Sequence, residues 1–453
     1  MKKQTILGST LCLGLVAACS SSSSTGTTVD SGKGDVVTTT DAGRKPDGGT
    51  TKDAAKDTAG DKPDTASSTP DTGVDAGPVR HLLVTYDTTA PTTMFAVNLA
   101  TGNVDGTLTS HDKEAITDTS NASAPFLLNQ VEDVIDRLDP STWTVAASYS
   151  VALPADGGTG GSDSMAVVVA EPTQAYVIRY NSNVIDVIDP TKTTDAGTPT
   201  GSIDLTSLVQ TADADGFVEA TAGTYVSSSK LLYVVLGNVN LYATDTYMGN
   251  TDTICGTTSS TVIAIDTMTN AVKTLGGTGP GGGIALAGYD PTSAVYDAAN
   301  GRIFIFEAGC NIAPTTEAGA PGAVKLRGVE AVDLTTNTSK VLVDTSDKGF
   351  PGSFVYINAH QAVVGFSYPT YEAYNWDPTQ TTLASQLPNA PNLFDYDGNG
   401  NLVGATVNYP AVGSATTDIL SMSLGDGTAT TLVANVIPPG NGYIGSVGVW
   451  PRP

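Results

Sequence analysis

The 453-residue sequence predicts an all-β fold built from a repeated sheet. The prediction depends on three observations: the secondary-structure pattern, a recurring strand motif and the spacing of its copies. After residue 80, helical periodicity is nearly absent, and short β-branched runs alternate with Gly, Asn, Asp and Pro. One strand pattern recurs seven times, as a hydrophobic alternation followed by Asp or Asn and a Thr-rich turn. The steps between copies are 41, 50, 77, 67, 42 and 48 residues, and four of them match a blade of roughly 40–50 residues. The fold class predicted is therefore a seven-bladed β-propeller.

The seven copies of the repeat share one polar residue at the end of a strand. These residues are Asn98, Asp139, Asp189, Asp266, Asp333, Asn375 and Ser423. A short polar side chain at this position caps the turn between the third and fourth strands of a blade. We therefore interpret these acids as turn formers rather than catalytic groups.

Two blades can be followed strand by strand. The fifth is predicted at Ser293–Asp297, Gly301–Glu307, Gly328–Asp333 and Ser339–Val343, and the seventh at Asn392–Tyr396, Asn401–Asn408, Asp418–Leu424 and Ala429–Val436. After the seventh, only the single strand Tyr443–Trp450 remains. The N-terminal repeat, which begins with the strand Arg80–Tyr86, lacks one strand. The C-terminal strand is thus expected to complete the N-terminal blade and to close the ring without an exposed edge.

This pattern resembles the seven-bladed propellers of the YVTN type, whose blades carry the same hydrophobic-Asp-Pro-Thr turn, as in Val184-Ile-Asp-Val-Ile-Asp189-Pro-Thr. The resemblance covers most of residues 80–453. It concerns the fold and implies no particular activity.

The N-terminus is typical of an exported protein. Two lysines precede the apolar run Ile6–Val16, and small residues follow it, which is the composition of a signal peptide. The small residues directly before Cys19 resemble the lipobox of bacterial lipoproteins. This resemblance implies that residues 1–18 are removed, that Cys19 carries the lipid (palmitate among its acyl chains), and that Ser20 directs sorting to the outer membrane. The alternative is an ordinary signal peptide with an incidental cysteine.

The segment 19–79 contains almost no large apolar residue, so we expect a disordered tether between the anchor and the folded domain 80–453. That domain has 13 Lys and Arg against 36 Asp and Glu, a net charge of about −23. Such a charge opposes binding to nucleic acid or to an anionic lipid surface.

Two cysteines remain in the domain, Cys255 and Cys310. Each lies in an insertion between the second and third strands of a blade, Asn238–Ser260 in the fourth and Cys310–Leu326 in the fifth. Such loops emerge on one face of a propeller and these two blades are neighbours, so a disulfide is predicted, with free thiols as the alternative.

Candidate metal ligands are few. Asp395, Asp397 and Asn399 resemble the start of a calcium loop, but the twelfth position is Thr406 instead of Glu, and a hairpin turn explains the same residues. Calcium is the one cofactor considered. The three histidines, His81, His111 and His360, lack metal-ligand spacing, and the glycine-rich segment Gly277–Gly283 is expected to be a flexible loop between blades.

The leading functional hypothesis is a non-enzymatic binding or scaffold module at the outer membrane or cell surface, with a protein or glycan ligand on one propeller face. The alternative is a lactonase-like hydrolase with a divalent cation in the channel, for which Glu132, Asp133 and Glu219 are candidate ligands. A third hypothesis, by analogy with an eight-bladed lipoprotein, is a role in outer-membrane barrel assembly.

Overall fold

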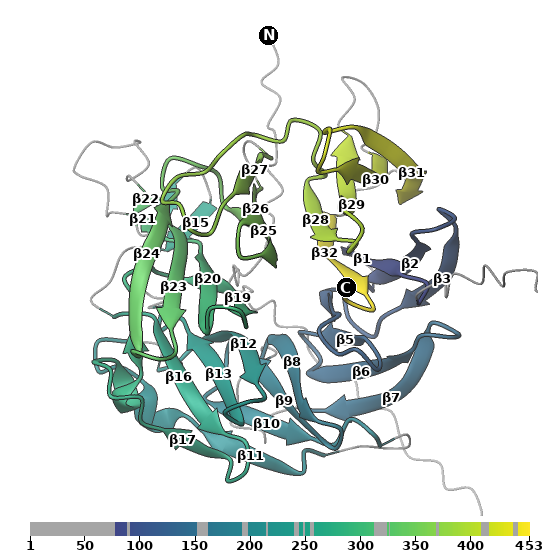
Figure 1. The fold of residues 1–453 in the computed structure, drawn as a ribbon. Coiled ribbons are helices and arrows are strands. Elements are labelled where there is room, and N and C mark those ends of the chain that lie inside the picture. The colour runs from purple at the N-terminus through teal and green to yellow at the C-terminus, as the bar shows by residue number, and fades with distance from the viewer. Residues whose placement is uncertain are drawn as a thin grey trace, which may run out of the picture. The chain divides into compact units, whose positions relative to one another are not determined.

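The computed structural model describes residues 78–87, 91–151, 162–192, 198–213, 216–239, 244–247, 250–253, 258–311, 324–325, 327–367, 371–408, 416–437 and 443–453. These residues form a seven-bladed β-propeller, which confirms the predicted fold class (Figure 1). Residues 1–77, including Cys19, lie outside the described residues. No helix among the described residues is long and apolar enough to span a membrane.

The first four blades follow one another along the chain, each named here from its innermost strand outward. Blade A contains β32 (Tyr443–Trp450), β1 (His81–Asp87), β2 (Thr93–Asn98) and β3 (Val104–Thr109); blade B contains β4 (Ala115–Asp118), β5 (Phe126–Asn129), β6 (Val134–Asp139) and β7 (Thr144–Ser150); blade C contains β8 (Ser164–Glu171), β9 (Gln174–Arg179), β10 (Val184–Ile188) and β11 (Gly201–Asp204); blade D contains β12 (Ala220–Val226), β13 (Leu231–Leu236), β16 (Thr261–Asp266) and β17 (Ala271–Lys273), with β18 (Ile284–Ala285) also paired to β16.

The remaining three blades complete the ring. Blade E contains β19 (Pro291–Asp297), β20 (Arg302–Glu307), β23 (Gly328–Asp333) and β24 (Thr338–Asp344); blade F contains β25 (Pro351–Asn358), β26 (Gln361–Phe366) and β27 (Ala373–Trp376); blade G contains β28 (Leu393–Tyr396), β29 (Asn401–Asn408), β30 (Thr416–Ser423) and β31 (Ala429–Ile437). Two short 3₁₀ helices, η1 (Thr206–Leu208) and η2 (Pro280–Gly282), lie in connections.

The ring closes as the sequence predicts. Strand β32 pairs antiparallel with β1, with Leu82 opposite Val449 and Val84 opposite Val447. The last strand is therefore the innermost strand of the first blade, and blade A is assembled from both ends of the domain.

Blade F has three regular strands, and an irregular segment takes the place of the fourth. The N–H of Asn375 donates to the carbonyl of Ser385 at 3.0 Å, and the N–H of Leu387 donates to that of Ala373 at 2.8 Å. The outer edge of β27 is therefore covered by backbone hydrogen bonds.

Each interface between neighbouring blades contains one apolar cluster, and these seven clusters form most of the core of the described residues. The cluster between blades G and A, for example, joins Leu82 and Val84 to Val403 and Ile419. Alternate residues of each strand face the two neighbouring blades, so the strands in the middle of a blade read as continuous apolar runs, such as Leu231–Leu236.

The turn between the third and fourth strands is capped in every blade by the same hydrogen bond. A side-chain oxygen accepts the backbone N–H two residues further on: Asn98 from Ala100, Asp139 from Ser141, Asp189 from Thr191, Asp266 from Met268, Asp333 from Thr335, Asp377 from Thr379 and Ser423 from Gly425. The interpretation as turn formers is confirmed. Hydrogen bonds from Ser141 hold the pKa of Asp139 below its ordinary value.

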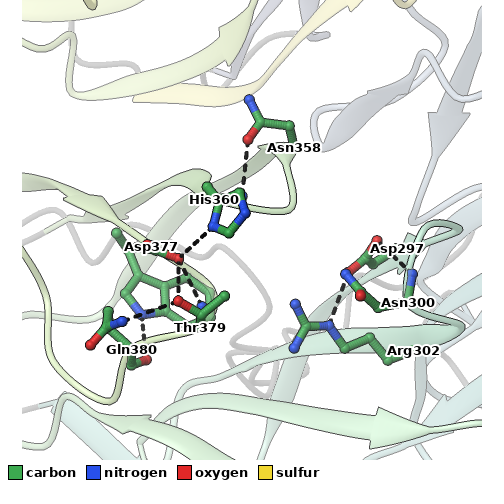
Figure 2. Close-up of polar contacts among 9 residues, drawn as sticks. Asp297, Asn300, Arg302, Asn358, His360, Asp377, Thr379 and Gln380 are labelled. Carbon is green, nitrogen blue, oxygen red and sulfur yellow. Dashed lines mark hydrogen bonds and ion pairs between the residues drawn. The ribbon is translucent and has the colours of Figure 1, made fainter.

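The sixth repeat requires a correction. The capping residue there is Asp377, whereas Asn375 lies inside β27, because the strand continues through Trp376 before the Asp-Pro-Thr turn. Figure 2 shows the Asp377 carboxylate, which accepts hydrogen bonds from the backbone N–H and the hydroxyl of Thr379. His360 Nδ1 lies 3.7 Å from the same carboxylate.

The two insertions lie side by side, as expected. The hairpin of β14 (Thr244–Tyr247) and β15 (Asn250–Thr253) belongs to blade D, and the pair β21 (Cys310–Asn311) and β22 (Val324–Lys325) belongs to blade E. Strand β15 contacts β21 (Figure 1). Cys310 is 3% exposed and disulfide-bonded. Cys255 lies outside the described residues, so its pairing with Cys310 stays a prediction.

The glycine-rich segment between blades D and E is a packed turn, and the expectation of a flexible loop is wrong. The N–H of Gly277 donates to Gly282 at 3.1 Å, and that of Gly279 donates to Gly283 at 2.9 Å. A Cβ added to Gly281, whose φ is +61°, would lie 2.6 Å from Leu208. Glycine is required here because both the dihedral angle and the contact exclude a side chain.

Candidate functional site

The seven inner strands, β4, β8, β12, β19, β25, β28 and β32, line a central channel, and each contacts the next around the ring. An inner strand pairs with a neighbour on one side only, so its other edge carries backbone groups that the sheet does not use. Polar side chains of neighbouring inner strands accept hydrogen bonds from some of the backbone N–H groups along this edge.

Four such side-chain contacts connect consecutive blades from F through G, A and B to C. Ser353 accepts the N–H of Phe394 at 3.0 Å, Asp395 that of Val449 at 2.9 Å, Ser446 that of Thr117 at 2.8 Å, and Asp118 that of Val167 at 2.7 Å. Each bond joins one inner strand to the inner strand of the following blade. The contacts therefore bind together the part of the ring in which the two chain ends meet.

A cavity of about 280 Å³ lies in the channel between β19, β25, β28 and β32. Its lining includes Val295, Tyr356, Tyr396 and Val447, together with Arg452 from the segment that follows β32. Tyr356 lies near the C-terminal end of β25, Tyr396 ends β28 and Arg452 follows β32, so the cavity extends toward that face of the propeller. This is a concave site formed by four blades.

The charge at this cavity is unusual for such an acidic domain. Arg452 is exposed, and its Nε donates to Thr119 Oγ1 at 3.3 Å, which orients the guanidinium. Arg80 lies nearby, because a Cβ on Gly398 would meet both Arg80 and Pro453 at 2.4 Å. The carboxylate of Asp395, also in the lining, accepts the N–H groups of Tyr396 and Val449. The cavity therefore presents an exposed cation beside a carboxylate that is already hydrogen-bonded.

Tyr356 provides a neutral polar group in the same lining. Burial, together with the hydrogen-bonded carboxylate of Asp297, raises the pKa of Tyr356 to about 12. Asp297 is in turn held by Asn300 and by Arg302, whose Nε lies 2.9 Å from it (Figure 2). The Tyr356 phenol thus keeps its proton across the physiological pH range.

The proposed calcium loop is a hairpin turn between β28 and β29. Asp397 accepts the N–H of Asn399 at 2.7 Å and the N–H of Asn401 at 3.0 Å, and Gly398 and Gly400 have positive φ angles of 77° and 92°. Asp395 instead reaches across to β32. Within the described ranges, no three His, Cys, Asp or Glu side chains form a group that could hold a metal ion.

The three acids suggested as channel ligands do not come together on inner strands. Glu132 is exposed and Asp133 is buried, both on the turn between β5 and β6, where Asp133 accepts the N–H of Ser162 at 2.7 Å. Glu219 alone directly precedes an inner strand, β12, and it accepts the N–H of Val239 at 2.9 Å.

Glu219 belongs to a row of acids that the sequence analysis missed. Glu114, Asp163, Glu219 and Asp290 each directly precede the inner strand of their blade, in blades B to E. The carbonyl of each accepts the N–H of the residue that follows the second strand, namely Gln130, Tyr180, Gly237 and Ala308. Burial raises the pKa of Asp163 and of Asp290 to about 7. Aligning the repeats on their first strands, rather than on their third, would have revealed this row.

The remaining histidines also stand apart. His81 Nε2 lies 2.9 Å from Asp105 in blade A, while His111 is exposed 3.7 Å from Asp136. No two of the three histidines share a site in the described part of the chain that could bind a metal.

Comparison with known proteins agrees with the propeller fold. No family model matches the chain, and no curated protein matches its sequence. Among solved structures, a protein from Lactobacillus plantarum is similar at a TM-score of 0.52 and 14% identity, covering 82% of this chain and 99% of its own. A candidate 6-phosphogluconolactonase from Bacteroides uniformis is similar at a TM-score of 0.51 and 10% identity, covering 82% and 99%. At such identities the likeness establishes the fold alone: residues 78–453 form a seven-bladed β-propeller of the architecture found in these structures.

Proposed function

We propose that this protein is a non-enzymatic binding module of the bacterial cell envelope, anchored by a lipid on Cys19. The channel cavity is the proposed ligand site, and the observation that carries the proposal is the position of Arg452 in its lining. A cavity of about 280 Å³ accommodates one sugar ring or one side chain of a larger glycan or protein ligand.

The chemistry of the lining favours an anionic group on the ligand. Arg452 offers planar, charged donors for a carboxylate or phosphate, and the aromatic rings of Tyr356 and Tyr396 offer apolar surface with polar edges. The domain as a whole repels anions with its net charge of about −23. The exposed Arg452 is therefore a positive group within a negatively charged domain, and it favours an anionic ligand in this cavity over one elsewhere on the surface.

The test is a thermal-shift screen of the full-length protein with anionic monosaccharides, such as uronic acids, and their neutral counterparts. We expect the anionic sugars to raise the melting temperature, Arg452→Ala to abolish the shift, and Lys113→Ala to retain it. Lys113 is a suitable control because it is half-exposed and lies in the connection before β4, outside the cavity lining. Equal shifts in wild type and Arg452→Ala would exclude this site.

The anchor has its own test. Cys19→Ser protein is expected in the soluble fraction, because serine lacks the thiol that carries the lipid. Wild type is expected in the membrane fraction, held by more than one acyl chain. Protease shaving of intact cells then distinguishes the cell surface from the periplasm.

The second candidate is a lactonase-like hydrolase, favoured by the fold shared with the Bacteroides protein. Such an enzyme is expected to use a channel cation, with Asp395 in the cavity as its nearest carboxylate. Lactone hydrolysis that depends on calcium and is lost with a chelator supports this candidate. A melting temperature unchanged by calcium and by chelator argues against it.

A further inference from the structure

Three blades carry a polar pair at the same place in the sheet. The last residue of the second strand lies diagonally across from the third residue of the third strand, as Asn129 and Asp136 in blade B, Arg179 and Asp186 in blade C, and Glu307 and Glu330 in blade E. Asn129 Nδ2 donates to Asp136 at 2.9 Å, and Arg179 Nη2 lies 2.9 Å from Asp186. The pairs therefore occupy equivalent positions, and in each the acceptor is a carboxylate.

The donor in blade E differs from the other two. An amide and a guanidinium donate hydrogen bonds at every physiological pH, whereas Glu307 can donate only while it is protonated. Glu307 is 1% exposed and Glu330 is 0% exposed. Burial, and then the charge and the hydrogen-bonded carboxylate of Glu330, raise the pKa of Glu307 well above its ordinary value. The hydrogen bond between these two buried carboxyl groups requires a proton on one of them, and Glu307, whose pKa is raised, carries it.

The pair Glu307–Glu330 contacts the linker 287–290, which connects blade D to blade E. Glu330 accepts the N–H of Ala287 at 2.9 Å and the N–H of Gly288 at 2.9 Å. The Glu307 carboxyl packs against Gly288 so closely that a Cβ there would lie 1.2 Å from Oε2. Since both carboxyl groups contact Gly288, the position of the linker is coupled to the hydrogen bond between them.

The same linker supports both insertions. The carbonyl of Tyr289 accepts the N–H of Gly309 at 2.8 Å, and its phenol lies 3.1 Å from Thr258 Oγ1. Tyr289 also packs against Cys310 and Val239 in a small buried cluster. Thr258 and Val239 flank the β14–β15 hairpin, and Cys310 begins β21. The linker therefore contacts residues beside both insertions, Thr258 and Val239 next to the first and Gly309 and Cys310 next to the second.

Two further charged groups face this region. Asp290, at the end of the linker, is buried and interacts with the Arg327 cation, which lowers its pKa against the effect of burial. The Nε of Arg327 donates to the carbonyl of Ala308 at 2.7 Å, and its Nη1 donates to Lys348 and Gly349 in the connection to blade F. Asp290 also acts on Glu307 directly and raises its pKa further. The charged and titratable neighbours of Glu307 are thus Glu330 from β23, Asp290 from the linker and, beyond it, Arg327.

We propose that Glu307 and Glu330 form a proton-dependent latch that holds the linker 287–290 and, through Tyr289, the two paired insertions. With the proton present, Glu307 donates to Glu330, and Glu330 accepts both linker amides. When the proton is lost, the donor disappears and a second charge is buried beside the first. Opening of the linker then hydrates both carboxylates, so rising pH favours release of the insertions.

The test is hydrogen–deuterium exchange of the segment 284–311 in the full-length protein, compared between wild type and Glu307→Gln and corrected for the intrinsic exchange rate at each pH. Glutamine keeps a donor toward Glu330 and cannot lose it. In wild type the opening constant of this segment is expected to rise about tenfold more per pH unit than in the variant, because opening releases one additional proton. Asp290 titrates in both proteins and cancels in the comparison.

The internal control is the segment 126–139, where Asn129 and Asp136 already form the pair with a permanent donor. Its opening constant is expected to respond identically to pH in wild type and in the variant. Equal pH dependence of the segment 284–311 in the two proteins would overturn the latch.

A second measurement does not depend on the variant folding. Infrared spectra of wild-type protein labelled with ¹³C-glutamate are expected to show a protonated glutamic acid carbonyl at neutral pH, separated from aspartic acid by the label. The band is expected to disappear at the pH at which the rise in the opening constant of the segment 284–311 levels off, because Glu307 then ionises in the closed state as well. Absence of a protonated glutamic acid at neutral pH would also overturn the proposal.

Discussion

Asp395 on β28 accepts a hydrogen bond of 2.9 Å from the backbone N–H of Val449 on β32, and so joins the inner strands of blades G and A. The second carboxylate oxygen accepts the N–H of Tyr396. One side chain therefore connects the last complete blade to the blade in which the ring closes.

We expect Asp395→Ala to lower the free energy of unfolding by about 1–3 kcal/mol, because the N–H of Val449 loses its acceptor at a partly buried position. Asp395→Asn, which keeps an acceptor oxygen, is expected to lose less. Urea unfolding followed by circular dichroism measures both. The exposed Glu132→Ala serves as the control, and an Asp395→Ala protein as stable as this control would contradict the prediction.

Stability is expected to fall as pH rises from about 4 to about 7. Burial raises the pKa of Asp87, Asp163 and Asp290 to about 7 and that of Asp186 to about 6, from 3.8. Since the folded protein then binds more protons than the unfolded chain, the stabilisation is fully present below pH 3.8 for these groups and is lost as pH passes the raised values. Each of these groups is expected to contribute on the order of a few kcal/mol.

Denaturant unfolding at steps across this range measures the effect. Asp87→Asn is expected to reduce the slope of stability against pH by about one proton, because asparagine does not titrate. Asparagine keeps an acceptor oxygen for Thr92 and Ala115, so the local hydrogen bonds are retained. A stability that is constant or increasing between these pH values would show that the buried acids ionise normally.

The close packing of Gly288 makes it intolerant of a side chain. Gly288→Ala is expected to destabilise the protein by about 1–3 kcal/mol, because the new methyl group overlaps the Glu307 carboxyl. Gly201→Ala is the matched control: its Cβ meets only Val187, at 4.0 Å, and a change within about 0.5 kcal/mol is expected. Thermal unfolding compares the two, and equal melting temperatures would mean that the linker moves aside freely.

The predicted partner of Cys310 is Cys255. Under non-reducing conditions neither thiol is expected to react with an alkylating reagent, and peptide mass spectrometry is expected to recover the two cysteines linked. Recovery of both as alkylated thiols would refute the pairing. Because the bond closes the insertion of one blade onto that of its neighbour, reduction is expected to increase proteolysis within residues 238–260 first.

The repeat was visible in the sequence because its turns use a local rule. A cap at Asp333 accepts a hydrogen bond from Thr335, two residues away, so the signal lies within a short stretch of chain. The pairing of β32 with β1 could also be inferred, because an incomplete first blade and a surplus last strand are both visible. Asn375 was wrongly chosen as the sixth cap because alternation alone does not show where a strand ends.

The candidate site could not be predicted in the same way. Arg452, Tyr356 and Val295 come from separate parts of the chain, and only the closed ring brings them to one cavity. The Glu307–Glu330 pair was hidden for a related reason. Glu307 is the last residue of the apolar strand β20, and Glu330 lies within the apolar strand β23. Their contact depends on the register between these two strands. Glu132 and Asp133 lie on the turn between β5 and β6 and not on an inner strand, a difference that the sequence pattern alone did not reveal.

The assembly of blade A has a consequence for biosynthesis. Strand β1 is synthesised first, yet its partner β32 is synthesised last, so the first blade cannot form until almost the entire domain has been made. A chain interrupted anywhere before Tyr443 keeps an open sheet edge on β1, which is a template for pairing with another chain. The first blade thus becomes complete only when the last strand is present, and truncated chains differ from the finished protein by that unpaired strand.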